Sequence, residues 1–143
     1  MSESVQANGK CLCGKVEITA NTLSTNVGAC HCKMCQKWSG GPFLTVDGKQ
    51  DLSVNGEENI TAYNSSEWAQ RAFCKHCGTH LYYRLKQTGQ TIFSSGLFDT
   101  VADLKFDHQI FTDEKPDWYD FANDTHNMTG AEVFAAFNGE NQD

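Results

Sequence analysis

Seven cysteines fall into three short clusters, and their spacing is the strongest chemical signal in this chain of 143 residues. The clusters are Cys11-Leu12-Cys13-Gly14, Cys30-His31-Cys32-Lys33-Met34-Cys35 and Cys74-Lys75-His76-Cys77-Gly78. Thiolates at such spacings are typical ligands of zinc, which prefers four ligands in a tetrahedron with Zn–S distances of ~2.3 Å. We therefore expect the cysteines to bind metal, because disulfides are rare in reducing compartments. The alternative is a small secreted protein whose cysteines form disulfides.

The first and third clusters share a glycine directly after their second cysteine, Gly14 and Gly78. A glycine at this position lets the backbone turn and brings amide N–H groups towards the thiolates. We predict that the two clusters together form one closed zinc site, made of Cys11, Cys13, Cys74 and Cys77. Such a site is structural, because four thiolates leave no coordination position open. A redox dithiol at Cys74 and Cys77 and an iron–sulfur cluster are the alternatives.

The middle cluster offers three sulfurs, from Cys30, Cys32 and Cys35, within six residues and without an obvious fourth ligand. Three protein ligands and a free position are typical of a catalytic or exchangeable zinc, so we predict a second zinc here, partly occupied in the isolated protein. The alternatives are three cysteines without metal and a second closed site completed by a histidine, namely His31, His76 or His80. Of these, His31 is expected to point away from the metal, and the other two to be hydrogen-bonding neighbours of the four-cysteine site.

Short segments of alternating apolar and polar residues connect the clusters and predict a mainly antiparallel β fold. Strands are predicted around Val16 and Ile18 and over 42–46, 52–54, 59–63, 68–73, 81–85, 91–98 and 106–111. Because Asn55-Gly56 is a strong hairpin signal, 59–63 is predicted to pair with 52–54. Helices are predicted over 30–38 and over 131–137, the latter after a capping box formed by Thr129 and Glu132.

Composition and charge suggest one domain and exclude some classes of partner. We predict a flexible tail over residues 1–9 and one domain over 10–138, with an acidic extension from about residue 99. The first 98 residues carry nine Lys/Arg against seven Asp/Glu, whereas residues 99–143 carry two against eleven. Such an acidic region argues against binding to nucleic acid or to an anionic membrane. The start, MSESVQANGK, has no apolar signal segment, so we expect a cytoplasmic location.

The three clusters also give the chain a resemblance to a known family. The matching stretches are Cys11-Leu12-Cys13-Gly14-Lys15-Val16, then Ala29 to Gly40, then Phe73-Cys74-Lys75-His76-Cys77-Gly78-Thr79. A later stretch, His108-Gln109-Ile110-Phe111 through Lys115-Pro116-Asp117-Trp118-Tyr119, is also similar. Over roughly residues 10–120 the sequence resembles the glutathione-dependent formaldehyde-activating family, which includes the centromere protein V type of domain.

The resemblance implies a β-tent fold of packed antiparallel sheets with short helices, and the same division of cysteines between a structural and a second zinc. It also implies a carbon–sulfur lyase that adds glutathione to formaldehyde to give S-hydroxymethylglutathione. The expected partner is therefore a small thiol such as glutathione. Cations that could meet its carboxylates are Lys33 and Lys37, four residues apart, together with Arg71 and Arg84, and Trp118 could border a pocket.

Two functions other than an enzyme stay open at this point. The chain could be a zinc module without catalytic activity that binds a small thiol or a protein partner, because no general acid or base can be singled out from the sequence. It could also be a thiol or metal stress sensor that uses Cys32 and Cys35.

Overall fold

The computed structural model describes residues 3–141, which divide into two compact units. Within these residues, the first unit comprises the chain up to Asn26 and Thr45–Lys105. The second comprises Val27–Leu44 and the chain from Phe106 onwards. Each unit joins segments that are distant in the sequence, and each contains one of the two predicted cysteine sites. None of the described helices is long and apolar enough to cross a membrane.

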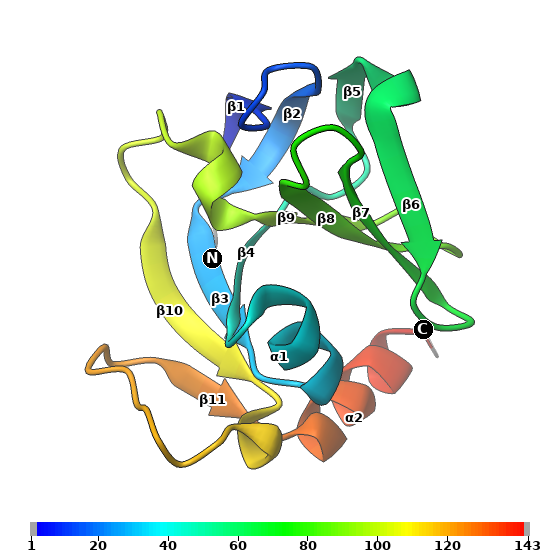
Figure 1. Ribbon diagram of the computed structural model, residues 1–143. Coiled ribbons are helices and arrows are strands. Elements are labelled where there is room, and N and C mark those ends of the chain that lie inside the picture. The colour runs from blue at the N-terminus through cyan, green and yellow to red at the C-terminus, as the bar shows by residue number, and fades with distance from the viewer. Residues whose placement is uncertain (1–2, 142–143) are drawn as a thin grey trace. The chain divides into compact units, whose positions relative to one another are not determined.

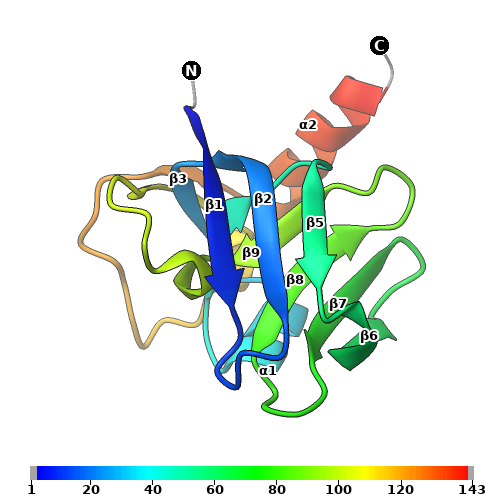
Figure 2. The same ribbon diagram turned by 90° about the horizontal axis from the view of Figure 1, so that it is seen from above.

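The first unit is built of antiparallel strands, in agreement with the predicted mainly β fold. Its three-stranded sheet has the order β1 (Ser4–Lys10), β2 (Glu17–Ser24) and β5 (Leu52–Asn55), which lie side by side in Figure 2. Five further strands have the order β4 (Phe43–Asp47), β9 (Thr91–Ser94), β8 (His80–Leu85), β7 (Ala69–Cys74) and β6 (Ile60–Asn64). Strand β4 enters this unit at Thr45 and pairs from there with β9.

Alternate residues of these strands form the core of the first unit. Ile18 on β2, Leu81 on β8 and Phe93 on β9 are completely buried. The Phe93 ring packs edge-on against Tyr82 and against Phe98, which belongs to a 3-10 turn over Ser95–Phe98. The period of two along each strand therefore places apolar side chains between the sheets, as the sequence pattern predicts.

The predicted hairpin between 52–54 and 59–63 is wrong. Strand β5 pairs with β2, and β6 pairs with β7. Gly56 has a positive φ of 89°, but it leads into a 3-10 turn over Glu57–Asn59 instead of a tight hairpin. A Cβ at Gly56 would lie 1.9 Å from the carbonyl oxygen of Lys15, so this glycine permits a close approach to the first cysteine loop.

The N-terminal residues also differ from the predicted tail over residues 1–9. Ser4–Lys10 forms β1, which pairs antiparallel with β2. Only Ala7 and Gly9 of this strand are buried, which explains the weak apolar pattern of its sequence. A Cβ at Gly9 would lie 2.4 Å from the carbonyl oxygen of Leu97, so the glycine lets β1 approach the 3-10 turn closely.

The second unit combines strands and both α-helices. Its elements are β3 (Asn26–Cys30), α1 (Lys33–Ser39), β10 (Lys105–Ile110), a 3-10 turn (Thr112–Glu114), β11 (His126–Met128) and α2 (Gly130–Asn141). Strand β10 lies between β3 and β11 and runs parallel to β11 (Figure 1). The capping box before α2 is confirmed, because the Glu132 N–H donates to Thr129 Oγ1 and the Thr129 N–H donates to Glu132 Oε1.

Candidate metal centres

The four cysteines of the first unit lie close enough to bind one metal ion. The sulfurs of Cys11, Cys13, Cys74 and Cys77 all lie within 4.8 Å of one another. The Cys13 sulfur is 3.6 Å from that of Cys11 and 3.7 Å from that of Cys74. A tetrahedron with Zn–S distances of ~2.3 Å has edges of ~3.8 Å, whereas a disulfide needs ~2.05 Å. The spacing of free sulfurs therefore fits a tetrahedral thiolate site.

Two loops that each end at a glycine, 11–14 and 74–78, position these sulfurs. The Gly14 N–H donates to the Cys11 carbonyl at 3.0 Å, and the Gly78 N–H donates to the Cys74 carbonyl at 2.8 Å. Both glycines have a positive φ, 79° and 78°, and an added Cβ would meet no atom within 4 Å. Backbone conformation rather than space thus favours glycine at both positions.

Thr79 links the two loops. Its Oγ1 accepts a hydrogen bond of 3.0 Å from the Leu12 N–H and lies 3.1 Å from the Cys77 sulfur. Since the oxygen is already an acceptor, its own hydrogen is available to the sulfur. Burial opposes ionisation of Cys77, but hydrogen bonds, foremost from the Thr79 side chain, lower its pKa to about 5.

The four thiols differ in how readily they ionise. The Lys15 backbone N–H acts to lower the pKa of Cys13, yet burial and the neighbouring thiols of the cluster together outweigh it and raise this pKa to about 11. A first thiolate therefore opposes ionisation of the next one. A divalent cation among the sulfurs would remove this repulsion, because it stabilises every thiolate that it binds.

The three cysteines of the second unit are positioned by the junction between a strand and a helix. Cys30 ends β3, Cys32 is the N-cap of α1, and Cys35 is a buried residue of that helix. The Cys35 N–H donates to the Cys32 sulfur at 3.4 Å, so this sulfur caps the helix in place of an oxygen. The three sulfurs lie within 4.8 Å of one another. The junction of β3 and α1 therefore brings together the three sulfurs that the C-x-C-x-x-C spacing predicts to share one site.

Crowding of the three sulfurs opposes their charge. Hydrogen bonding with Cys32 and Cys35, then burial, hold the pKa of Cys30 far above its ordinary value. Three neighbouring thiolates without a cation would repel one another in a poorly solvated place. This donor set fits a soft divalent metal, which binds thiolates directly.

His31 lies between two of these cysteines but has other partners. It is completely buried, with Nε2 2.8 Å from Gln109 Oε1 and Nδ1 2.6 Å from the Tyr119 hydroxyl. Because an amide oxygen only accepts, Nε2 carries the hydrogen and Nδ1 accepts from Tyr119. Burial lowers the pKa of His31, which favours this neutral form. Among the described residues, neither of the two cysteine groups includes a histidine as a further metal ligand. His76 instead has its Nε2 2.8 Å from Asn59 Oδ1.

The hydrogen bonds of His31 continue through residues that the sequence analysis missed. Gln109 Nε2 donates to Thr125 Oγ1 at 2.9 Å. Near the helix, Gln36 Nε2 donates to the carbonyls of His31 and Glu114, at 2.7 and 2.8 Å. No sequence signal pairs residues so far apart, although Gln109 and Tyr119 lie in the last stretch that resembles the family.

The predicted substrate contacts are divided between the units. Lys33 and Lys37 are exposed on α1, and Trp118 is 72% exposed, with its ring 4.8 Å from the Tyr119 ring and tilted by 55° to it. Arg71 differs from the expected accessible cation, because it is only 4% exposed and its guanidinium lies over the Tyr83 ring. It belongs to the first unit, whereas the two lysines and Trp118 belong to the second.

Comparisons with known proteins agree with the sequence motifs. The model of the family "Glutathione-dependent formaldehyde-activating enzyme" matches residues 6–114. An uncharacterized lyase of Schizosaccharomyces pombe is 39% identical over 126 residues, which cover 87% of this chain and 92% of the relative. A protein of Podospora anserina named "Putative glutathione-dependent formaldehyde-activating enzyme" is 40% identical over 84 residues, 54% of this chain and 39% of that protein. The crystal structure of a Rhodobacter sphaeroides protein is similar with a TM-score of 0.57 and 26% identity, covering 66% of this chain and 90% of that one.

Proposed function

This chain belongs to the glutathione-dependent formaldehyde-activating family, and from this membership we propose that it is a zinc-dependent carbon–sulfur lyase acting on a glutathione–aldehyde adduct. In this proposal Cys11, Cys13, Cys74 and Cys77 bind a structural zinc. The observation that carries the proposal is the second group, whose three sulfurs lie within 4.8 Å of one another and come from six consecutive residues. A tetrahedral ion bound there would have a fourth position without a cysteine ligand, which a substrate thiol could occupy.

The proposed reaction joins glutathione to formaldehyde. One sulfur–carbon bond forms, the π electron pair of the carbonyl moves to its oxygen, and the thiol proton ends on that oxygen as S-hydroxymethylglutathione forms. When bound by three thiolates, zinc supplies a position for a further thiolate and is a weak activator of water. Because the addition is easy without a catalyst, the chain contributes mainly by orienting the two reactants.

The exposed lysines of α1 are the proposed contacts for the carboxylates of glutathione. Lys33 and Lys37 are four residues apart and so lie on the same face of the helix that contains Cys35. Exchanging either lysine for glutamine should raise KM with little change in kcat, because the contact is made equally in the ground and transition states. Lys86→Gln removes a lysine that is also exposed, but belongs to the first unit, and is the matched control.

The activity is tested by measuring the formation and breakdown of the hemithioacetal with zinc-loaded protein, glutathione and formaldehyde. We expect a rate above that of buffer, which Cys35→Ser abolishes and Met34→Ala, an exposed neighbour on α1, preserves. A rate equal to that of buffer contradicts the named reaction. Turnover with another thiol or aldehyde would keep the reaction class and change the substrate.

A zinc module that binds a thiol without turnover is the second candidate. It is favoured by a cavity of about 600 Å³ in the first unit, which is lined by Cys11 of the four-cysteine group and by no cysteine of the second group. Calorimetric titration with glutathione separates the two candidates. Tight binding of glutathione to the wild-type protein without any turnover supports the module and contradicts the lyase.

A further inference from the structure

A cavity of the first unit lies apart from both cysteine groups. Its volume is about 470 Å³, within the range of small-molecule sites. Residues of β5, β8 and the neighbouring turns line it: Gln50, Leu52, Ser53, Val54, Glu57, Tyr82, Arg84 and Gly89. The predicted zinc sites use none of these residues, and Arg84 is the one lining residue among the cations that the sequence offered for the carboxylates of glutathione.

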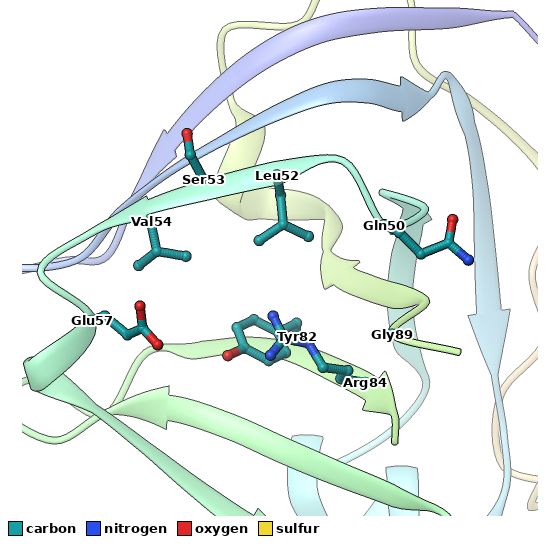
Figure 3. Close-up of a pocket in the computed structure, with 8 residues that line it drawn as sticks. All are labelled: Gln50, Leu52, Ser53, Val54, Glu57, Tyr82, Arg84 and Gly89. Atoms are coloured by element: carbon teal, nitrogen blue, oxygen red, sulfur yellow. The ribbon is translucent and has the colours of Figure 1, made fainter. Parts of the chain in front are cut away.

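The cavity has an apolar and a polar side, which Figure 3 shows. Leu52 and Val54 point into it from β5, while Ser53 between them points away. Tyr82 and Arg84 face them from β8, with the guanidinium lying over the tyrosine ring at 4.7 Å from its centroid. The alternation of both strands therefore places two aliphatic side chains opposite a stacked cation.

Two opposite charges border this space without neutralising each other. Among the side chains of residues 3–137 the Glu57 carboxylate has no hydrogen-bond or ion-pair partner, and Figure 3 shows it pointing into the cavity from one side. Arg84 Nε donates to Thr91 Oγ1 at 3.2 Å, which leaves its terminal nitrogens without a hydrogen-bond partner among the described residues. An arginine keeps its charge at every physiological pH, so the Arg84 guanidinium can bind an external anion. The Glu57 carboxylate can bind an external cation in the same way.

Tyr82 adds a polar group to the floor. The residue is only 5% exposed, and its hydroxyl, which points towards the Glu57 side, has no hydrogen-bond partner among the side chains of residues 3–137 or the described backbone. Burial raises its pKa, so the hydroxyl stays protonated and can donate or accept a hydrogen bond. The hydroxyl is not among the buried side-chain atoms that lack a partner, so water reaches it, and a ligand that bonds to it would replace this water.

We propose that this cavity binds a small linear zwitterion, such as an ω-amino acid, with its ammonium group at Glu57 and its carboxylate at Arg84. The methylene chain of the ligand contacts Leu52 and Val54, and the Tyr82 hydroxyl bonds to one of the charged ends. A ligand with a single charge leaves Glu57 or Arg84 unpaired beside it. The site therefore selects for two opposite charges on one molecule.

The test uses 5-aminopentanoate as the probe, with pentanoate and pentylamine as ligands of one charge each. Binding to the full chain is followed by NMR, from the amide shifts of residues 52–57 and 82–89. We expect saturable binding of 5-aminopentanoate that is at least about tenfold tighter than that of either control ligand, because each ionic end adds a charged hydrogen bond. Equal affinity for the three ligands, or no shift of these amides, overturns the proposal.

Two variants assign the ends of the ligand. Arg84→Gln should weaken 5-aminopentanoate and pentanoate about tenfold, and Glu57→Gln should do the same for 5-aminopentanoate and pentylamine. Lys86→Gln, outside the cavity, should change none of them. Glu57 is exposed, so its exchange tests the proposal even if Arg84→Gln perturbs the fold. Loss of binding of the same size in Lys86→Gln would show an unspecific charge effect and overturn the assignment.

Discussion

The two cysteine groups are assembled in opposite ways. In the first unit, sulfurs only 3.7 Å apart belong to Cys13 and Cys74, which are 61 residues apart in the sequence. In the second unit, all three sulfurs come from the end of one strand and the first turn of one helix. The first group therefore exists only when distant strands have folded together, whereas the second follows from local structure.

This difference determines what a metal does for each region. A metal that joins distant segments closes a long loop, and its binding energy contributes to folding. A metal on six consecutive residues closes almost no loop, so it can leave without unfolding the chain. Local assembly thus suits an exchangeable ion, and long-range assembly suits a permanent one.

The largest effect is expected from exchanging one cysteine in each group. Cys77→Ser should lower the free energy of unfolding by ~4 kcal/mol or more, because the metal that joins the two loops of the first unit is lost. Cys35→Ser should change it by about 1 kcal/mol or less and remove only the second metal. Circular dichroism, thermal unfolding and zinc per chain measure both effects. Equal unfolding of the two variants would mean that the second group is structural too.

A smaller effect is expected from the buried histidine of the second unit. His31→Leu should destabilise this unit by ~2–4 kcal/mol, because Gln109 and Tyr119 lose their partner in a buried place. Hydrogen exchange should accelerate at β10 and α1 but not at β7 and β8. The exposed His76→Leu, which loses one hydrogen bond to Asn59, is the control and should cost less than ~1 kcal/mol. Faster exchange in both units would contradict two separately stabilised regions.

Thr79 tests the link between the loops of the first unit. Thr79→Val removes the acceptor of the Leu12 N–H and the donor to Cys77, and should destabilise this unit by ~1–2 kcal/mol. Zinc affinity of the four-cysteine group should fall about 10- to 100-fold, which competition with a chromophoric chelator measures. Thr79→Ser keeps the hydroxyl and should restore the affinity. A Thr79→Val protein with unchanged affinity would show that the hydroxyl is not needed.

The smallest expected effect concerns the start of α2 and its dependence on pH. Hydrogen bonds, foremost from the Thr129 backbone N–H, lower the pKa of Glu132 below the ordinary value of 4.5. A lowered carboxyl pKa stabilises the helix above pH ~4.5, and this contribution is lost as pH falls through the folded-state pKa. An NMR titration should show the Thr129 amide moving in this range and fixed in Glu132→Ala. If the Thr129 amide of Glu132→Ala moved over the same pH range as in the wild type, this result would contradict the capping box.

The division of the cysteines could be predicted because spacing and glycines are local properties. The glycines after Cys13 and Cys77 have the positive φ that the turn requires, and both helices lie near their predicted positions. Partners across long distances could not be predicted in this way. Gln109 and Tyr119 are 78 and 88 residues from His31, and no period or motif connects them.

Strand pairing shows the same limit. Asn55-Gly56 has the sequence of a tight hairpin, but Gly56 is needed for the close approach to Lys15, and β5 finds its partner in β2. Similarly, β1 has too little apolar pattern to be predicted as a strand. Its place is determined by its pairing with β2 and by the close approach of its glycine to Leu97. Local sequence preferences predict where strands and helices form, whereas the choice of the strand with which each strand pairs depends on the packing of the whole unit.

The discontinuous second unit has a consequence for the chain while it leaves the ribosome. All four cysteines of the first unit have been synthesised by residue 77, and the last strand of that unit ends at Ser94. The partners of His31, by contrast, lie at Gln109 and Tyr119 and emerge later. During translation Cys30, Cys32 and Cys35 are therefore present before the strand that completes their surroundings. In this interval a nascent chain offers a loose set of three thiols to the zinc and the oxidants of its compartment.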